Sequence, residues 1–248
     1  MAELIGKKVF FLHPPSVIQE EMIFLLMAAE YEVSLLHDPG QALRVLAKFP
    51  DSILFVNIDA GMEEPEWEAY VGRIMADTEK KDVRIGIISY NPSKELAEKY
   101  LMNVGVPCGY VTLKLGLKES FKIIVKALEA NEARGRRKYV RAVCRPQDRA
   151  TFNVKFQGQF LTGNIIDISS VGMACTFDKK VSMKVGTSVG DIQLKLRAAL
   201  CKVAGKLVGF HAGTDNRYVL LFEEVDSRDK QKIHQFVYNK LQEEIDKI

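Results

Sequence analysis

The stretch FLTGNIIDISSVGMACTF, residues 160–177, decides the fold of the C-terminal half of the chain. It contains two short β-rich segments, 160–169 and 172–177, separated by Ser170 and Val171. Four further β-rich segments surround it, at residues 149–156, 189–196, 199–210 and 217–225. Glycine, asparagine and aspartate supply turn signals between the segments. Six short strands at this spacing predict a small antiparallel barrel.

A helix is predicted after the last strand, because residues 227–248 have an amphipathic pattern. Its apolar stripe consists of Ile233, Phe236, Val237, Leu241 and Ile245. We expect this stripe to pack on the barrel rather than on a membrane.

The N-terminal half has a different pattern, in which short apolar runs alternate with helical periods. The runs fall at residues 7–12, 32–36, 52–58, 83–89 and 108–113. Because they are β-rich and nearly continuous in apolar residues, they predict buried parallel strands with helices on both faces of one sheet. The predicted helix starts are Ser16 with Gln19, Asp38-Pro39 and Asn91-Pro92, and the last helix covers 117–134 before Gly135.

The charge distribution indicates two domains. Residues 1–130 carry 14 Lys/Arg and 19 Asp/Glu, a net charge of −5, whereas residues 131–248 carry 21 and 13, a net charge of +8. We therefore predict an α/β domain with a (βα)5 parallel sheet at 1–134. An all-β domain, the six-stranded antiparallel barrel with its C-terminal helix, follows at 135–248. A basic hinge at 136–141 joins them, and we expect an anionic partner for the second domain.

Several classes of function lack the sequence features that they need. The longest uncharged apolar run, Met22 to Ala29, is far shorter than the roughly 20 residues of a membrane helix, and no signal-peptide core is recognisable. The four cysteines and four histidines are scattered, which predicts neither a disulfide scaffold nor a metal site. Dinucleotide and P-loop motifs are absent, and no catalytic set has a recognisable spacing. We therefore expect a cytoplasmic protein that is not an enzyme and has no cofactor.

Two short motifs are separated along the sequence by a spacing that is informative about function. Arg137-x-x-x-Arg141 is followed 26 positions later by Asp167-x-Ser169-x-x-Gly172. Together with the barrel pattern, they make roughly residues 135–245 resemble a PilZ domain. The resemblance implies a receptor for the bacterial second messenger cyclic di-GMP. It also implies the roles of the motif residues, with the two arginines as a clamp and Asp167, Ser169 and Gly172 reading the base, the glycine keeping the turn tight.

The chemistry of these residue types fits that ligand. Guanidinium groups bond bidentately to phosphate oxygens and to the O6/N7 edge of guanine. A carboxylate such as Asp167 can accept the N1–H and N2–H donors of guanine. Arg136 adds a third guanidinium, which in this family can accompany binding of a stacked pair of ligands. The alternative is that 136–141 is a solvated helix end and that Asp167 and Ser169 only satisfy the backbone donors of a turn.

The first domain resembles a response-regulator receiver domain in pattern, without the residues that carry receiver chemistry. His13-Pro14 stands where the family has an acidic pair after the first strand, and the phosphoacceptor position falls on Asn57 or Val56. A magnesium site needs several hard oxygen ligands, which are missing here. We therefore predict a degenerate receiver that serves as a scaffold or docking surface.

Two features of this domain leave alternatives open. Ser89 and Lys114 match the receiver's hydroxyl and lysine positions, and Asp59 would be the phosphoacceptor in a shifted alignment. The acidic residues of the segment 63–68 around Trp67 are predicted to begin a solvated helix, since acids suit a helix N-terminus; the alternative is a partner-binding patch.

We therefore expect a signalling protein that binds cyclic di-GMP and transmits its level through a domain rearrangement and protein–protein contacts. An unidentified protein partner would dock through the receiver-like domain, whereas nucleic acid and membrane are not expected partners. Two alternatives stay open: a nucleic-acid-binding protein that uses the basic hinge, and a phosphorylation-controlled response regulator with a PilZ output. Against the first, the barrel strands carry no row of stacking aromatics.

Overall fold

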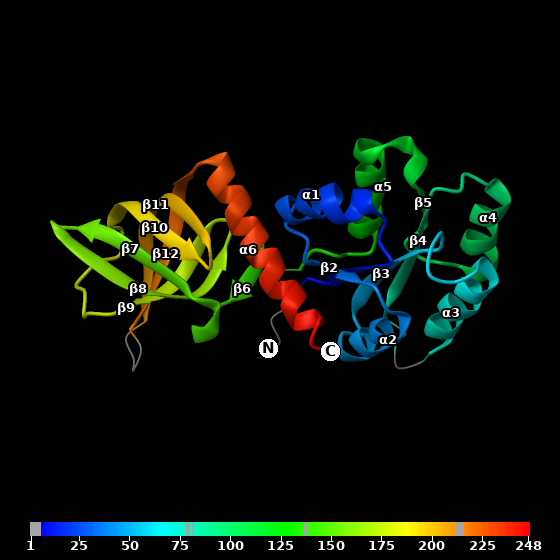
Figure 1. The fold of residues 1–248 in the computed structure, drawn as a ribbon, viewed down its shortest axis with the longest axis horizontal. Coiled ribbons are helices and arrows are strands. Elements are labelled where there is room, and N and C mark those ends of the chain that lie inside the picture. The colour runs from blue at the N-terminus through cyan, green and yellow to red at the C-terminus, as the bar shows by residue number, and fades with distance from the viewer. Residues whose placement is uncertain (1–5, 78–79, 81, 136–137, 212–215) are drawn as a thin grey trace. The chain divides into compact units, whose positions relative to one another are not determined.

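The computed structural model describes residues 6–77, 80, 82–135, 138–211 and 216–248. The chain divides into two compact units, which we consider separately (Figure 1). The first unit comprises the chain up to residue 138 together with 241–248, and the second comprises 139–240. We predicted a single division after residue 134; the structure divides the chain after 138 and returns the last residues to the first unit.

The first unit is built on a five-stranded parallel sheet. Its strands are β1 (Lys8–Leu12), β2 (Val33–Leu36), β3 (Ser52–Asn57), β4 (Arg84–Ser89) and β5 (Tyr110–Thr112). They lie in the order β2-β1-β3-β4-β5, and each neighbouring pair is parallel. This confirms the predicted receiver-like sheet. Its strand order is one in which ligands bind outside the carboxyl ends of the strands.

Helices cover both faces of this sheet (Figure 1). One face carries α1 (Ile23–Ala28), preceded by the π-helical turn η1 (Ile18–Met22), and α5 (Leu117–Ala130), which follows the 3-10 turn η4 (Leu113–Leu115). The other carries α2 (Pro39–Lys48), α3 (Glu64–Ala76) and α4 (Lys94–Glu98), which continues into the π-helical turn η3 (Lys99–Val104). Trp67 of α3 is completely buried in the core on this second face, beside Tyr70.

The helix starts agree with the sequence at one of three positions. Asp38 caps α2 as predicted, because its carboxylate accepts the Gln41 N–H at 2.5 Å and Pro39 follows it. The predicted cap at Ser16 is wrong: its partner Gln19 instead donates its side-chain amide to the Pro14 carbonyl at 2.6 Å.

The predicted start at Asn91 is also wrong. The cap of α4 is Ser93, whose hydroxyl accepts the Leu96 N–H at 3.1 Å, while the Asn91 side chain accepts the Ser93 N–H. Asn91 thus shapes the turn before the helix and does not begin the helix itself.

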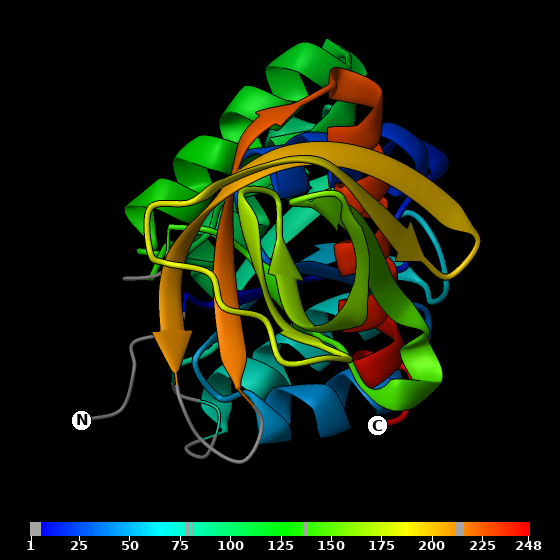
Figure 2. The ribbon, with the colours of Figure 1, turned by 90° about the vertical axis from the view of Figure 1, so that its left-hand side faces the viewer.

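The second unit is a closed six-stranded barrel (Figure 2). Its strands are β7 (Ala150–Phe156), β8 (Gln159–Ser169), β9 (Gly172–Phe177), β10 (Ser188–Leu196), β11 (Ala199–His211) and β12 (Arg217–Val225). Antiparallel pairing runs β7-β10-β11-β12-β9, and the pairing of β9 and β7 with β8 closes the barrel. All six strands were predicted within about two residues of their observed ends.

A seventh strand, β6 (Arg141–Val143), was not predicted. It pairs antiparallel with the end of β8, beyond the part of β8 that pairs with β7. A 3-10 turn, η5 (Pro146–Asp148), connects β6 to β7. The strand is only three residues long, so it has too few residues for a recognisable alternation pattern.

The C-terminal helix, α6 (Ser227–Ile245), corrects one expectation. Ile233, Phe236 and Val237 are buried and belong to the second unit. Ile245, which we expected on the barrel, is buried in the core of the first unit. Beside it, the Gln242 side chain accepts the Leu35 N–H at 2.8 Å and donates to the Leu35 carbonyl at 2.9 Å. The apolar stripe is therefore divided between two cores. Within the described residues, no helix has the length and apolarity to cross a bilayer.

Candidate ligand-binding site

The two motifs meet on one face of the barrel. In the pair β6–β8, Arg141 lies opposite Ser169, and Asp167 precedes Ser169 by two residues on the same strand. Because side chains on a strand alternate between faces, these three side chains share one face. Gly172 lies opposite Ser169 in the pair β8–β9 and joins them. Four of the predicted site residues are thus brought together by three strands.

These residues line a cavity of about 260 Å³, which we call the β8–β9 depression. Its lining consists of Arg141, Asp167, Ser169, Val171, Gly172, Met173, Ala174, Val208, Arg217, Val219, Leu220 and Leu221. Gly172 and Ala174 of β9 lie opposite Leu221 and Val219 of β12. The small residues of β9 therefore form the floor of the depression, and larger side chains on the neighbouring strands form its walls.

Gly172 is required by the packing of strands. A Cβ atom at this position would lie 2.6 Å from the backbone oxygen of Leu220 in β12, closer than real Cβ contacts occur. Its φ is not in the left-handed region, so the turn itself does not demand glycine. The expected reason, a tight turn, is thus replaced by the close approach of β9 to β12.

Arg141 and Asp167 are the charged motif residues that line the β8–β9 depression. Arg141 is exposed and Asp167 is half-buried. Among the described residues, neither side chain forms a hydrogen bond or an ion pair. Unlike most half-buried carboxylates, Asp167 therefore keeps its acceptor atoms available for a ligand.

Ser169 is held differently. It is 3% exposed, its hydroxyl accepts the Val171 N–H at 3.4 Å, and it donates to the Gly172 carbonyl at 3.3 Å. These bonds fix the turn between β8 and β9. The turn-forming alternative therefore describes Ser169, but it does not describe Asp167.

Arg217 is a residue that the motifs did not indicate. It opens β12, opposite His211 of β11, and shares a face with Val219, two residues further along. Its side chain is exposed and adds a second guanidinium to the lining of the depression. Only the pairing of β12 with β9 could have revealed it. Arg136 and Arg137, the two remaining predicted ligand-binding residues, lie outside the described residues.

The nearby thiols are unsuited to nucleophilic chemistry. Burial raises the pKa of Cys175 to about 12, and the charge of Asp167 acts in the same direction. Burial likewise raises the pKa of Cys144 to about 12, reinforced by Asp148. Both cysteines therefore stay protonated near neutral pH, and only a thiolate is an effective nucleophile.

Polar side chains at the carboxyl edge of the parallel sheet are hydrogen-bonded to one another and to the backbone. Asn57, at the end of β3, donates its side-chain amide to the His13 carbonyl at 2.8 Å. Asp59 accepts hydrogen bonds from the Ser89 hydroxyl and the Tyr90 N–H, both at 2.5 Å. Within the described part of the chain, no group of three His, Cys, Asp or Glu side chains could hold a metal ion.

His13 directly follows β1 at this edge of the sheet. Its ring meets Trp67 edge-on at a centroid distance of 5.7 Å. Burial lowers its pKa, the charge of His37 lowers it further, and Asp38 opposes both. An imidazole packed against an indole, rather than a carboxylate, therefore follows β1 at this edge.

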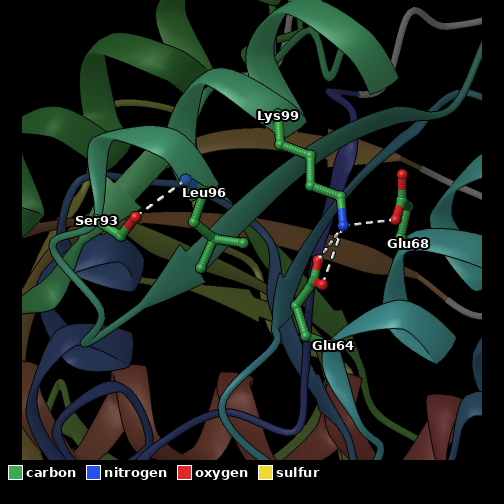
Figure 3. A network of polar contacts seen from close by, with 5 residues as sticks. All are labelled: Glu64, Glu68, Ser93, Leu96 and Lys99. Carbon is green, nitrogen blue, oxygen red and sulfur yellow. Dashed lines mark hydrogen bonds and ion pairs between the residues drawn. The ribbon is translucent and has the colours of Figure 1, made fainter.

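The acidic segment 63–68 is a helix start, as predicted. Glu63 and Glu66 form a reciprocal capping box at the N-terminus of α3. Figure 3 shows Lys99, at the beginning of η3, reaching between Glu64 and Glu68 of α3, at 3.0 and 2.6 Å. Hydrogen bonds from the ammonium to Glu68 and Glu64 raise the pKa of Lys99. The one ammonium therefore compensates part of the charge of these two acids within the unit.

Comparison with known proteins identifies the family of the second half of the chain. Residues 135–239 match the family model of the PilZ domain. This part of the chain is a PilZ domain. No curated protein matches the chain in sequence.

Solved structures resemble each half of the chain. The PilZ domain of YcgR from Escherichia coli with c-di-GMP is 16% identical, with a TM-score of 0.40 and coverage of 45% of this chain and 96% of that one. The MrkH–c-di-GMP complex from K. pneumonia is 16% identical, with a TM-score of 0.42 and coverage of 47% of this chain and 57% of that one. The signal receiver domain of an HD domain-containing protein from Pseudomonas fluorescens Pf-5 is 17% identical, with a TM-score of 0.41 and coverage of 51% and 97%.

Proposed function

We propose that the β8–β9 depression of the PilZ domain binds cyclic di-GMP and that the protein is a receptor for this second messenger. The observation that carries the proposal is the convergence of Arg141, Asp167, Ser169 and Gly172, from two separate motifs, on one cavity. The match to the PilZ family supports it.

Each side of the depression suits one part of the ligand. The Asp167 carboxylate would accept the N1–H and N2–H donors of guanine. The guanidinium groups of Arg141 and Arg217 would bond to phosphate oxygens or to the O6/N7 edge. The exposed apolar side chains of Val208 and Leu221 offer a surface for the face of a base.

The size of the depression indicates where the rest of the ligand would be held. A cavity of about 260 Å³ lies just below the roughly 300–1,000 Å³ of ordinary small-molecule sites. Arg136 and Arg137 precede Arg141 by a few residues, and we propose that they clamp the part of the ligand that extends beyond the depression.

Calorimetric titration of the full chain tests the assignment. Arg141→Ala and Asp167→Ala should each weaken cyclic di-GMP binding by about 2 kcal/mol, roughly thirty-fold, because each removes charge-assisted bonds. Lys155→Ala is the control, since this exposed lysine on β7 is not part of the lining. Affinities of the two site variants equal to that of the control would refute the assignment. GTP, cyclic AMP and single-stranded DNA should fail to displace labelled cyclic di-GMP.

We further propose that ligand binding acts through the segment before β6. Arg136, Arg137, Lys138 and Arg141 concentrate positive charge in six residues, and an anionic ligand bound to them and to Asp167 would relieve their repulsion. Such contacts favour one arrangement of the segment over others, which is how a ligand shifts a conformational equilibrium. Hydrogen exchange over residues 138–143 should slow on binding, and small-angle scattering should change. If both stay unchanged at saturating ligand, this segment does not transmit the signal.

A further inference from the structure

In the turn between β6 and β7, the acidic side chain is buried and the basic side chains are exposed. The Asp148 carboxylate is 3% exposed and accepts a hydrogen bond from the Lys240 ammonium of α6 at 2.7 Å. It also accepts the Arg145 N–H at 2.6 Å and lies 3.8 Å from the Arg197 guanidinium. The acid of the turn is therefore committed to the interior, whereas the side chains of Arg145 and Arg149 are exposed.

A polar row crosses three neighbouring strands beside this turn. Lys195 of β10 lies opposite Thr151 of β7, and Thr151 lies opposite Asn164 of β8. Leu194 and Phe152, the adjacent residues on β10 and β7, are buried in the barrel. Because strand residues alternate, the row lies on the outer face of the barrel.

The turn and the row enclose a cavity of about 620 Å³, which we call the turn cavity. Its polar lining is Arg145, Arg149, Lys195, Thr151 and Asn164, and its remaining lining is mostly apolar. It shares no lining residue with the β8–β9 depression. The volume lies well within the range of small-molecule sites.

The charge of the turn cavity is one-sided. Among the described residues, three cationic side chains and no carboxylate line it. Asp178, which is outside the lining, accepts hydrogen bonds from Asn164 at 3.2 Å and from Thr162 at 2.6 Å. The buried Asp148 of the turn is paired with Lys240. Like charges held around a concave surface repel one another, and they raise the local concentration of anions.

Arg149, which lines the cavity, has a left-handed backbone conformation. Its φ of 50° is in the left-handed region, which is unfavourable for a long side chain. The conformation ends the η5 turn, where the Arg149 N–H donates to the Pro146 carbonyl at 3.3 Å. A glycine or asparagine would fit this backbone more readily. The strained position is nevertheless occupied by an arginine that lines the cavity.

We propose that the turn cavity binds the phosphate groups of a small ligand of nucleotide size, at a site separate from the β8–β9 depression. Arg145, Arg149 and Lys195 would neutralise the phosphate charge, with Arg149 able to bond bidentately. Thr151 would add a hydroxyl hydrogen bond. The apolar side chains of Pro146 and Ile166 would contact the organic part of the ligand. This proposal does not depend on cyclic di-GMP binding.

Titration of the full chain at low ionic strength tests it, with inorganic pyrophosphate and adenosine 5′-diphosphate as probes. Arg149→Asn keeps a residue that tolerates the left-handed backbone, and Lys195→Gln changes an exposed strand residue. Each should weaken binding of both probes about tenfold or more. Lys155→Gln, an equal loss of charge on β7 outside the cavity, should leave binding unchanged. Tighter binding of the nucleotide than of pyrophosphate would show that the apolar lining contributes.

Three results would overturn the proposal. The first is that neither probe binds the parent protein. The second is that Lys155→Gln weakens binding as much as Lys195→Gln, which would indicate a diffuse basic surface. The third is that only a single-stranded DNA oligonucleotide binds, with loss of binding in Arg149→Asn, which would identify a nucleic-acid surface. Circular dichroism of each variant establishes that loss of binding is not loss of folding.

Discussion

Replacing Lys240 by methionine should destabilise the PilZ domain strongly. Lys240 and Asp148 are 4% and 3% exposed, and their side chains are joined at 2.7 Å. Methionine fills most of the volume of the lysine stem but leaves the Asp148 charge buried. Among the described residues, Asp148 would still accept the Arg145 N–H. The Arg197 guanidinium is 38% exposed and lies 3.8 Å from the Asp148 carboxylate, beyond hydrogen-bond reach. Removing one partner of a buried ion pair costs about 3–5 kcal/mol of folding stability. We expect Lys240→Met to lower the free energy of unfolding by an amount in that range.

Urea unfolding provides the assay. Far-UV circular dichroism follows the whole chain, and fluorescence follows the single tryptophan, Trp67, which lies in the first unit. The variant should lower the midpoint seen by circular dichroism more than the midpoint seen by fluorescence. Lys232→Met, the same substitution at an exposed position of α6, is the control and should change little.

The double variant Asp148→Asn/Lys240→Met distinguishes pairing from packing. With both charges removed, the protein should be more stable than Lys240→Met alone, because no uncompensated charge remains buried. The reasoning is refuted if Lys240→Met costs less than about 1 kcal/mol, a value typical of exposed pairs. It is also refuted if the two single changes simply add in the double variant.

Three further predictions concern acid unfolding, strand packing and phosphorylation. Burial by itself raises the pKa of Asp148, but the hydrogen bonds from Lys240 and from the Arg145 N–H hold that pKa below its usual range. The stability that this contributes is present above about pH 4 and should be lost as the pH falls through the lowered pKa. Asp148→Asn should remove this loss from acid-unfolding curves. Gly172→Ala should cost about 1–3 kcal/mol in urea unfolding, since the added methyl meets the strand backbone of β12, whereas Ala at the open Gly190 should not. Acetyl phosphate with magnesium should leave the intact mass unchanged, and a gain of one phosphate that disappears in Asp59→Asn would show that the receiver chemistry survives.

The strands of both units could be predicted because their signals are local. Continuous apolar runs identified β1 to β5, and alternation between turn residues identified β7 to β12. The short β6 carries no such signal, and its existence depends on pairing with the end of β8. Helix starts were less predictable, since Asn91 and Ser93 are both good caps and only the surrounding turn decides between them.

The candidate site could be predicted only where the motifs named it. Arg141, Asp167, Ser169 and Gly172 were indicated by the two motifs that resemble those of the PilZ family, but Arg217 reaches the same depression through the pairing of β12 with β9. Such a contact joins residues about 50 positions apart, and periodicity within one segment carries no information about it. Ile245 shows the same limitation, because an apolar stripe indicates that a helix packs but not against which core.

The return of residues 241–248 to the first unit has a consequence for how this protein can be divided and inherited. The first unit is not contiguous in sequence, since its last segment follows the whole of the PilZ domain. A gene fragment that ends after residue 138 would encode the sheet without Ile245 in its core and without the Gln242 amide on the edge strand β2. A fragment beginning at residue 139 would carry those side chains with no core to receive them. Recombination that exchanged the first unit for another would therefore have to exchange the coding segments on both sides of the second unit, so the two units are expected to be inherited together.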